Sequence, residues 1–136
     1  VSVEVGGVIH IVAFLVLALA LYKNLHIRGM GTATAGTLMN TAVIVANGGR
    51  MPVLQQALEK AGVFEKSSSL LIPGKSLTHV LIGERTLFSF LGDVLWFRWP
   101  WMSGSAFSAG DVVLIAGVFL SIQTLMGVPS SSRRLG

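Results

Sequence analysis

The stretch Asn47-Gly48-Gly49-Arg50-Met51-Pro52 stands where a long uncharged run of the chain ends. Arg50 is the first charged residue after that run. Gly48 and Gly49 can adopt positive φ angles, which commonly end a helix. Pro52 suits the first turn of a new helix, where its missing N–H group costs little. The stretch therefore predicts that one long helix ends at the glycines and that a short helix follows.

The short helix is expected over residues 53–61, because apolar residues recur there at the spacing of one helical face. These residues are Leu54, Ala57, Leu58 and Ala61. Gly62 follows and is expected to end the helix. A helix of this amphipathic kind lies with its apolar face in a membrane interface.

Two interpretations of the glycine turn stay open. In the first, it is a helix stop followed by the start of the next element. In the second, Asn47, Arg50 and the N–H groups of Gly48 and Gly49 surround an anionic ligand or a lipid headgroup. The residue types fit both interpretations.

Arg50 is also expected to form an ion pair. An arginine in a poorly hydrated interface needs a bidentate acceptor. Asp93 lies in an apolar Leu-Gly-Asp-Val context, and Asp111 begins the last apolar segment. We therefore predict that Arg50 binds Asp93 or Asp111, a structural pair that holds the outer region onto the helix ends.

The composition is that of a membrane protein. Only 12% of the 136 residues are charged, against about 25% in soluble domains, and the mean hydropathy is +0.73. The absence of cysteine excludes disulfides, thiolate metal sites and cysteine nucleophiles, and we expect no metal site. The net charge is +4, but the basic residues are scattered, so nucleic acid is not an expected partner.

Three segments are expected to be transmembrane helices: residues 5–22, 29–46 and 112–128. Eighteen helical residues measure about 27 Å, close to the hydrocarbon thickness of about 30 Å. The predicted fold is an all-α integral membrane protein, a single domain of residues 1–136 with an irregular outer loop region at 47–111. The sequence begins with Val1 rather than Met, so we expect it to be the C-terminal part of a longer chain.

The second segment is expected to be the central, buried helix. Its small residues, such as the pairs Gly31 and Ala35 or Gly36 and Asn40, let helices approach closely in lipid. Asn40 lies in mid-helix, where an unpaired amide is costly. We therefore predict a bond from Asn40 to a neighbouring helix, while the first segment faces lipid.

His10 lies one to two turns inside the first segment. It can coordinate a chlorophyll-type magnesium, or a haem shared with another subunit. In the alternative it bonds to a neighbouring helix or to an interfacial water. At the start of the third segment, Asp111 is expected near the N-cap, where a carboxylate interacts favourably with the helix dipole.

The outer region carries an aromatic run, Trp96-Phe97-Arg98-Trp99-Pro100-Trp101. We interpret it as an aromatic belt at the headgroup level. In the alternative, Trp96, Arg98 and Trp99 form a cage for a ligand ring or a cation. Residues 65–69 are expected to be a flexible turn, 70–75 a Pro-Gly turn, and 78–82 a strand or an interfacial piece.

Several short motifs are spread along the chain. They are Ala46-Asn47-Gly48-Gly49-Arg50-Met51-Pro52-Val53, Ala57-Leu58, Gly62, His79, Thr86-Leu87, Leu91-Gly92-Asp93-Val94 and Gly110-Asp111-Val112. The pattern resembles a family of small bacterial multi-pass membrane proteins known as a domain of unknown function. Members of that family carry further hydrophobic sequence before the first segment. The resemblance implies a membrane protein and implies no particular activity.

The leading functional hypothesis is a non-catalytic membrane subunit that packs into a larger complex of photosynthetic or respiratory type and binds lipid or pigment. No cofactor can be named. The first alternative is a stand-alone module that binds or transports an anionic or quinone-like molecule at its outer face. The second is an enzyme on lipid-linked substrates, in which Arg50, His79, Asp93 and Asp111 converge and His79 acts as a base oriented by Asp93.

The expected location is the bacterial inner membrane, with lipids and other membrane subunits as partners. The loop at residues 23–28 is basic and contains no acid, and Arg133 and Arg134 lie near the C-terminus. Basic loops favour the cytoplasmic side. We therefore predict that this loop and the C-terminus are cytoplasmic and that residues 47–111 are extracytoplasmic.

Overall fold

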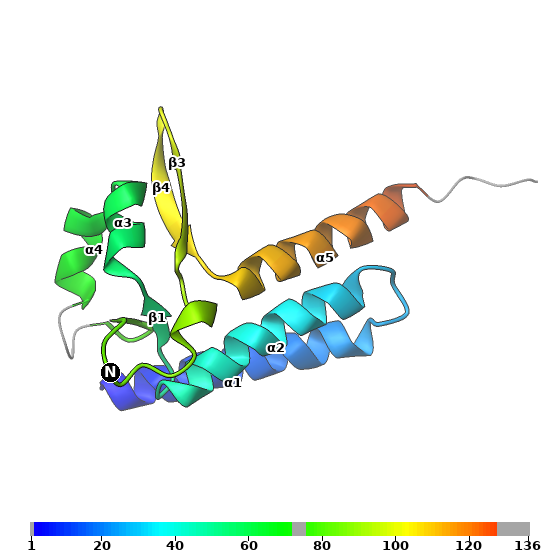
Figure 1. The fold of residues 1–136 in the computed structure, drawn as a ribbon. Coiled ribbons are helices and arrows are strands. Elements are labelled where there is room, and N and C mark those ends of the chain that lie inside the picture. Colours follow the sequence, from blue (N-terminus) through cyan, green and yellow to red (C-terminus); the bar gives the residue numbers. More distant parts are fainter. Residues whose placement is uncertain (1, 72–75, 128–136) are drawn as a thin grey trace, which may run out of the picture.

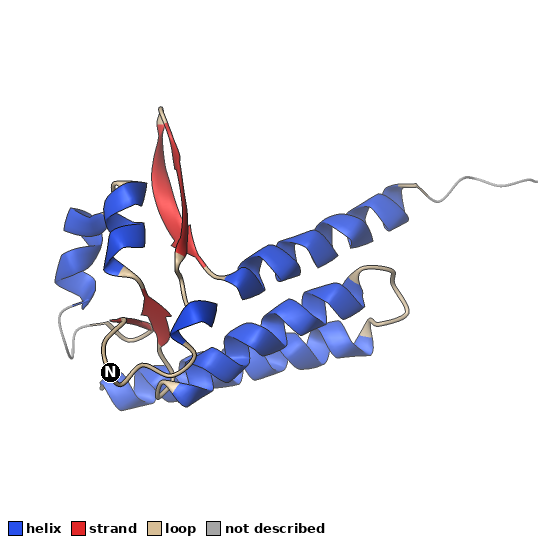
Figure 2. Ribbon diagram, in the orientation of Figure 1, coloured by secondary structure: helices blue, strands red, loops and turns tan. Residues whose placement is uncertain are grey.

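The computed structural model describes residues 2–71 and 76–127, and it is mostly helical (Figure 1 and Figure 2). The helices of this part are α1 (Val3–Lys23), α2 (Met30–Ala46), α3 (Gln55–Ala61), α4 (Phe64–Leu71) and α5 (Ala109–Met126), with a short 3-10 helix, η1 (Ser89–Leu91). The strands are β1 (Met51–Val53), β2 (His79–Leu81), β3 (Leu95–Trp99) and β4 (Met102–Phe107). The strands form two small sheets, so the prediction of an all-α chain is wrong.

The three long helices lie side by side, with α2 between α1 and α5 (Figure 1). The buried residues of α2 are Ala33, Thr34, Gly36, Thr37, Asn40, Thr41, Val43 and Ile44. Far fewer are buried in α1 and α5. The predicted central position of the second segment is therefore confirmed.

Two helices of the described residues, α1 and α5, are long and apolar enough to cross a membrane. With 17 residues, α2 is apolar but shorter than the other two. The loop between α1 and α2 and the end of α5 lie at one end of the bundle (Figure 1). Residues 47–71 and 76–108 lie at the other end.

Glycine residues allow α2 and α5 to approach closely. A Cβ atom added to Gly36 would lie 2.5 Å from the carbonyl oxygen of Gly110, and Gly117 lies against Ala33 in the same way. Small residues at such a contact let two backbones meet. Gly31, which was expected to share this role, is exposed.

The glycine turn fastens α2 to α1. Gly48 and Gly49 have φ angles of 67° and 84°, as the sequence predicts. Their N–H groups donate to the carbonyl oxygens of Val45 at 3.3 Å and Ile44 at 2.8 Å, which closes the end of α2. Gly49 also packs directly on the backbone of Gly7 in α1.

The short strand β1 organises the outer region. Met51 pairs in parallel with His79 of β2, and Val53 forms a bridge with Asp93 on the other side. Pro52 is buried inside this strand, so the prediction that it starts a helix is wrong. Its carbonyl accepts the Asp93 N–H at 2.8 Å. Proline fits here because the strand needs no N–H group at this position.

The two short helices follow β1. α3 ends at Gly62, whose φ angle of 73° agrees with the prediction of a helix end there. The next residues form α4, so the expected flexible turn at 65–69 is wrong. Val63 and Phe64 pack on a small core around Val53 and Leu58, and this burial stabilises the helix start. Of the expected Pro-Gly turn, residues 72–75 lie outside the described part.

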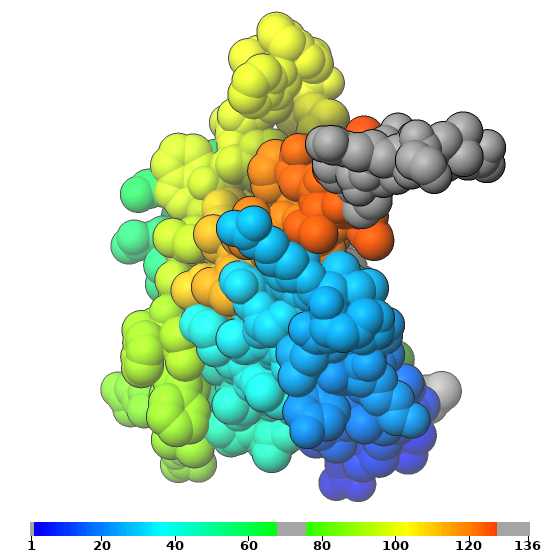
Figure 3. Space-filling model, turned by 90° about the vertical axis from the view of Figure 1, so that its right-hand side faces the viewer, coloured from blue at the N-terminus to red at the C-terminus, as the bar shows by residue number. Residues whose placement is uncertain are grey.

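The strands β3 and β4 form an antiparallel hairpin that pairs Leu95 with Phe107 and Trp99 with Met102. The hairpin projects from the molecule and runs across the direction of the long helices (Figure 1 and Figure 3). Its large apolar side chains are exposed, up to 80% for Trp101. The aromatic run of the sequence is thus a protruding ribbon.

Candidate functional site

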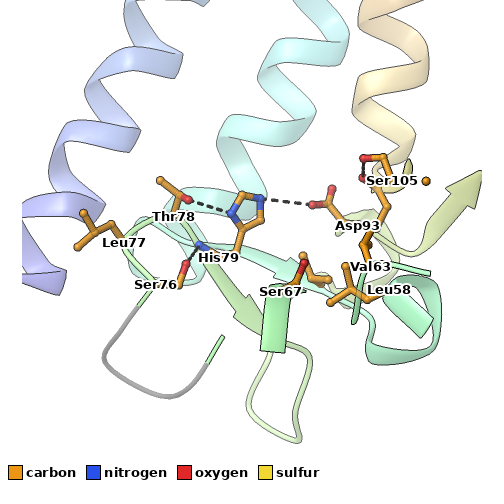
Figure 4. A pocket seen from close by; sticks show the side chains of 12 residues that line it. Leu58, Val63, Ser67, Ser76, Leu77, Thr78, His79, Asp93 and Ser105 are labelled. Atoms are coloured by element: carbon orange, nitrogen blue, oxygen red, sulfur yellow. Dashed lines mark hydrogen bonds and ion pairs between the residues drawn. The ribbon is translucent and has the colours of Figure 1, made fainter. Parts of the chain in front are cut away.

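The site is built on the two sides of β1, which bring His79 and Asp93 together (Figure 4). His79 Nε2 lies 3.6 Å from Asp93 Oδ2. The His79 side chain is 44% exposed and that of Asp93 is 10% exposed. Asp93 is therefore the more buried member of the pair.

Neighbouring hydroxyl groups orient the histidine. Thr78 Oγ1 lies 2.8 Å from His79 Nδ1, and the His79 N–H donates to Ser76 Oγ at 3.0 Å. In the tautomer with its proton on Nε2, the Thr78 hydroxyl donates to Nδ1, and Nε2–H faces Asp93. Thr78 on one edge and Asp93 on the other thus hold the imidazole ring of His79 in place.

His79 and Asp93 line a half-open cavity of about 640 Å³ (Figure 4). Its polar lining consists of Ser67, Ser76, Thr78, His79, Asp93 and Ser105. The apolar lining comes from Val53, Leu58, Val63, Leu77 and Ala106. No lysine or arginine is among the described residues that line it. A cavity with an apolar wall and a few fixed polar groups is typical of small-molecule sites.

Burial changes the proton affinity of both groups. Burial, with repulsion from Asp111, raises the pKa of Asp93 to about 7. Burial and the nearby His10 lower the pKa of His79, although Asp111 acts in the opposite direction. Near neutral pH the pair therefore gains or loses a proton easily, and it can donate or accept hydrogen bonds with a ligand.

Asp111 and Asn40 belong to a separate network between α2 and α5. Asn40 Nδ2 donates to Asp111 Oδ1 at 2.7 Å, and Ser108 Oγ donates to Asn40 Oδ1 at 2.8 Å. The N-cap of α5 is Ser108, and Asp111 completes a capping box three residues later. The N-cap of α5 is therefore Ser108 and not Asp111, which corrects the prediction. The predicted bond from Asn40 to a neighbouring helix is confirmed, because Asp111 belongs to α5.

The predicted ion pair of Arg50 is wrong for the described residues. Asp93 faces His79, and Asp111 is engaged by Asn40. Within residues 2–71 and 76–127, Arg50 forms no ion pair, and its Nε atom is buried without a hydrogen-bond partner. The Nε atom of Arg50 is thus a buried donor that the described residues leave unsatisfied.

The other residues of the expected anion site have internal partners. Asn47 Nδ2 donates to the carbonyl oxygens of Val43 at 2.8 Å and Leu87 at 2.9 Å, and Asn47 Oδ1 accepts the Leu87 N–H at 3.0 Å. The N–H groups of Gly48 and Gly49 close α2. The interpretation in which all of these groups bind an anion is therefore corrected: of the four, Arg50 is the one without a partner among residues 2–71 and 76–127.

His10 does not reach the cavity. Its Nδ1 atom lies 2.8 Å from the carbonyl oxygen of Gly49, and its ring meets Phe14 edge to face at 5.2 Å. The Nδ1 atom of His10 is thus bonded to the backbone of the glycine turn. Coordination of a pigment through the other nitrogen stays a prediction.

The expected aromatic cage residues lie on the hairpin and do not line the cavity. Trp96 lies under the Lys60 ammonium group at 5.8 Å, and Trp99 meets Trp101 edge to face at 5.8 Å. The Arg98 guanidinium group packs against Gly62. The contacts of Trp96 and Arg98 hold the hairpin against α3 and its C-cap, Gly62.

Sequence reasoning missed the serine and threonine residues of the site. Ser67, Ser76 and Thr78 come from helical and loop segments with no recognisable motif. The pairing of His79 with Asp93 was one hypothesis among several, because only the parallel pairing with β1 brings the two together. In the described residues, no three histidine or acidic side chains are arranged to hold a metal ion.

Comparison with known proteins places this architecture in a family. Residues 1–123 match the model of a family of unknown function, DUF5317. An uncharacterized protein of Thermotoga maritima is 27% identical over 108 residues, which cover 79% of this chain and 58% of that relative. The chain thus spans less than two thirds of the relative's length. No solved structure matches the chain. By its match over nearly the whole sequence, the chain belongs to the DUF5317 family of unknown function.

Proposed function

We propose that the protein is an integral protein of the bacterial inner membrane that binds a neutral, quinone-like small molecule in the cavity of His79 and Asp93. The observation that carries this proposal is the cavity itself, which combines an apolar wall with a pair of proton-exchanging groups. It lies at the end of the helix bundle, where a ligand can arrive from the membrane interface (Figure 4).

The exposed surfaces of α1 and α5 support the membrane placement. Large apolar side chains are exposed along both helices. In water, apolar faces of this extent would promote aggregation, whereas lipid chains cover them without cost. α2 is shielded between the other two helices and spans with them. The basic loop at residues 23–28 then lies on the cytoplasmic side, and the cavity lies on the extracytoplasmic side.

The cavity lining favours a neutral ligand over an anion. The described lining contains no cation, and ionised Asp93 repels negative charge. A quinone-type ring instead offers two carbonyl oxygens that accept hydrogen bonds. Protonated Asp93 or His79 Nε2–H can donate to one of them, while Leu58 and Val63 contact the ring.

The hypothesis of an accessory subunit stays a prediction. The exposed faces of α1 and α5 suit a protein partner, but lipid covers them equally well. The hypothesis of an enzyme on lipid-linked substrates also stays a prediction, because Arg50 and Asp111 lie outside the lining of the cavity. Binding is therefore the function that this geometry supports best.

Ligand binding can be tested with a water-soluble, short-chain quinone and the detergent-purified protein in isothermal titration calorimetry. We expect His79→Gln and Asp93→Asn to weaken binding at least about tenfold, because a hydrogen bond to a charged or buried group contributes about 1.5 kcal/mol or more. His26→Gln is the matched control, since His26 is exposed in the loop at the other end of the bundle. Equal affinities in all four proteins, or no binding by the wild type, would refute the proposal.

The hairpin provides a test of membrane placement, because all three tryptophans of the chain lie in or next to its strands. The hairpin runs across the helices at the end where α5 begins (Figure 1), so it lies along the membrane surface if the helices span. We expect bilayer lipids brominated near the headgroup to quench tryptophan fluorescence more strongly than lipids brominated near the chain ends.

Trp101→Phe should remove a large share of this quenching, since Trp101 is the most exposed of the three. Quenching by aqueous iodide together with insensitivity to both brominated lipids would place the hairpin in water instead. That outcome would contradict the belt interpretation.

A further inference from the structure

A second cavity, of about 530 Å³, lies at the outer end of α2 and is distinct from the cavity of His79. Its walls come from the residues around Arg50 and from the loop that carries Arg85 and Thr86. We propose that this cavity binds a phosphate-type oxyanion through Arg50 and Arg85. The inference is independent of the quinone-like ligand proposed above.

The first argument is the unsatisfied arginine. Arg50 is partly buried, and its Nε atom is fully buried without a hydrogen-bond partner. A buried donor on a charged group costs free energy unless it is paired. The guanidinium fork matches two oxygens of a phosphate or a similar anion. The Nε atom itself is closed to solvent, so an oxyanion in the cavity would be bound by the Nη groups of the same guanidinium. Its negative charge would balance a guanidinium that has no ion pair among the described residues.

The second argument is charge. Arg50 and Arg85 line the cavity with one acid, Glu84, so the lining carries an excess of positive charge. In the described residues, neither arginine forms an ion pair with Glu84. The negative end of the α2 dipole opposes an anion here, but the N–H groups of Gly48 and Gly49 already occupy carbonyl oxygens of its last turn.

The third argument is that the walls are fixed before any ligand arrives. The side chain of Asn47 binds both the N–H and the carbonyl of Leu87, which anchors the loop to α2. Within the loop, the Gly83 N–H donates to Thr86 Oγ1 at 2.9 Å, and the Thr86 N–H donates to the Gly83 carbonyl at 3.0 Å. Arg85 is carried by this tight turn, so both arginines are presented by a preformed frame.

The location allows two sources of the anion. Arg50 follows the end of α2 closely, at the level where lipid headgroups lie if the helix spans. The cavity is larger than one phosphate group, so it also has room for a headgroup substituent. The chemistry is the same for a free phosphate and for an anionic phospholipid, and the experiment separates the two.

The experiment measures thermal unfolding of the wild type in two settings. In neutral detergent, sodium phosphate is compared with sodium chloride at equal ionic strength. In nanodiscs, pure phosphatidylcholine is compared with a mixture that contains phosphatidylglycerol. A ligand at ten times its Kd should raise Tm by about 3 to 5 °C. A rise with phosphate indicates a free anion, and a rise only with phosphatidylglycerol indicates a lipid headgroup.

Arg50→Gln and Arg85→Gln should each abolish most of the rise, and Arg28→Gln is the matched control because Arg28 is exposed at the other end of the bundle. Arg85 is exposed, so its variant folds even if Arg50→Gln does not. Quinone affinity should be unchanged in Arg85→Gln, which keeps this result separate from the first cavity. The proposal is overturned if neither phosphate nor phosphatidylglycerol stabilises the wild type, or if Arg85→Gln keeps the full rise.

Discussion

Gly49→Ala is expected to lower the free energy of unfolding by about 3 kcal/mol or more, whereas Gly48→Ala should cost about 1 kcal/mol. Both glycines have positive φ angles, so both variants carry the strain of a left-handed conformation. They differ in their surroundings. A Cβ atom at Gly49 would lie 2.5 Å from the carbonyl carbon of Gly7, whereas a Cβ at Gly48 meets nothing within 4 Å.

The overlap at Gly49 involves backbone on both sides, so rotation of a side chain cannot relieve it. Either α1 moves away from α2 or the turn changes its conformation, and both disturb the bond between His10 and Gly49. Unfolding of the two variants in detergent, followed by circular dichroism at rising denaturant concentration, gives the comparison. Equal losses for the two variants would show that strain alone, and not the contact with Gly7, determines the effect.

The second large effect concerns pH. Asp93 is expected to lower the free energy of unfolding by up to about 4 kcal/mol as the pH rises from about 4 to 7. Its pKa is about 7 in the folded protein, against 3.8 for an unperturbed carboxyl group. The folded state therefore binds more protons than the unfolded state in this window, so stability decreases with pH and is constant above it.

His79 acts in the opposite direction. Its pKa is lowered in the folded protein, so its contribution to stability rises with pH up to about 6.5. The effect of Asp93 is therefore measured as the difference between the wild type and Asp93→Asn at each pH. The variant should be the more stable protein at pH 8 and should lose its advantage towards pH 4. Glu84→Gln, at an exposed acid, serves as the control; parallel curves for the wild type and Asp93→Asn would contradict the prediction.

The sequence predicts those features of the fold that depend on local chemistry. Gly48, Gly49 and Gly62 end helices as expected, because a positive φ angle at these positions follows from glycine itself. The central position of α2 follows from its small residues and from Asn40, which need protein neighbours. These arguments require no knowledge of distant contacts.

The strands and the site depend on distant contacts, and sequence reasoning fails there. β1 has only three residues. It is stabilised by backbone pairing with the segments of His79 and Asp93, which are distant in the sequence. At Pro52 the preference for a helix start is overridden by burial between these partners. The prediction of an ion pair for Arg50 is wrong because it rested on the expected depth of Asp93 and Asp111 relative to a membrane. In the folded chain, His79 lies against Asp93 and Asn40 bonds to Asp111.

The position of α2 between α1 and α5 has a consequence for the order of assembly during synthesis. α1 and α2 are joined by a short loop, so they can pair as soon as both have left the ribosome. The face of α2 that carries Gly36 and Asn40 must then wait until the whole outer region and α5 have been made. During that interval the amide of Asn40 lacks its final partners. If the helices insert into a membrane as proposed, a factor that assists insertion should hold this nascent intermediate, and crosslinks from position 36 should shift from that factor to α5 when synthesis is complete.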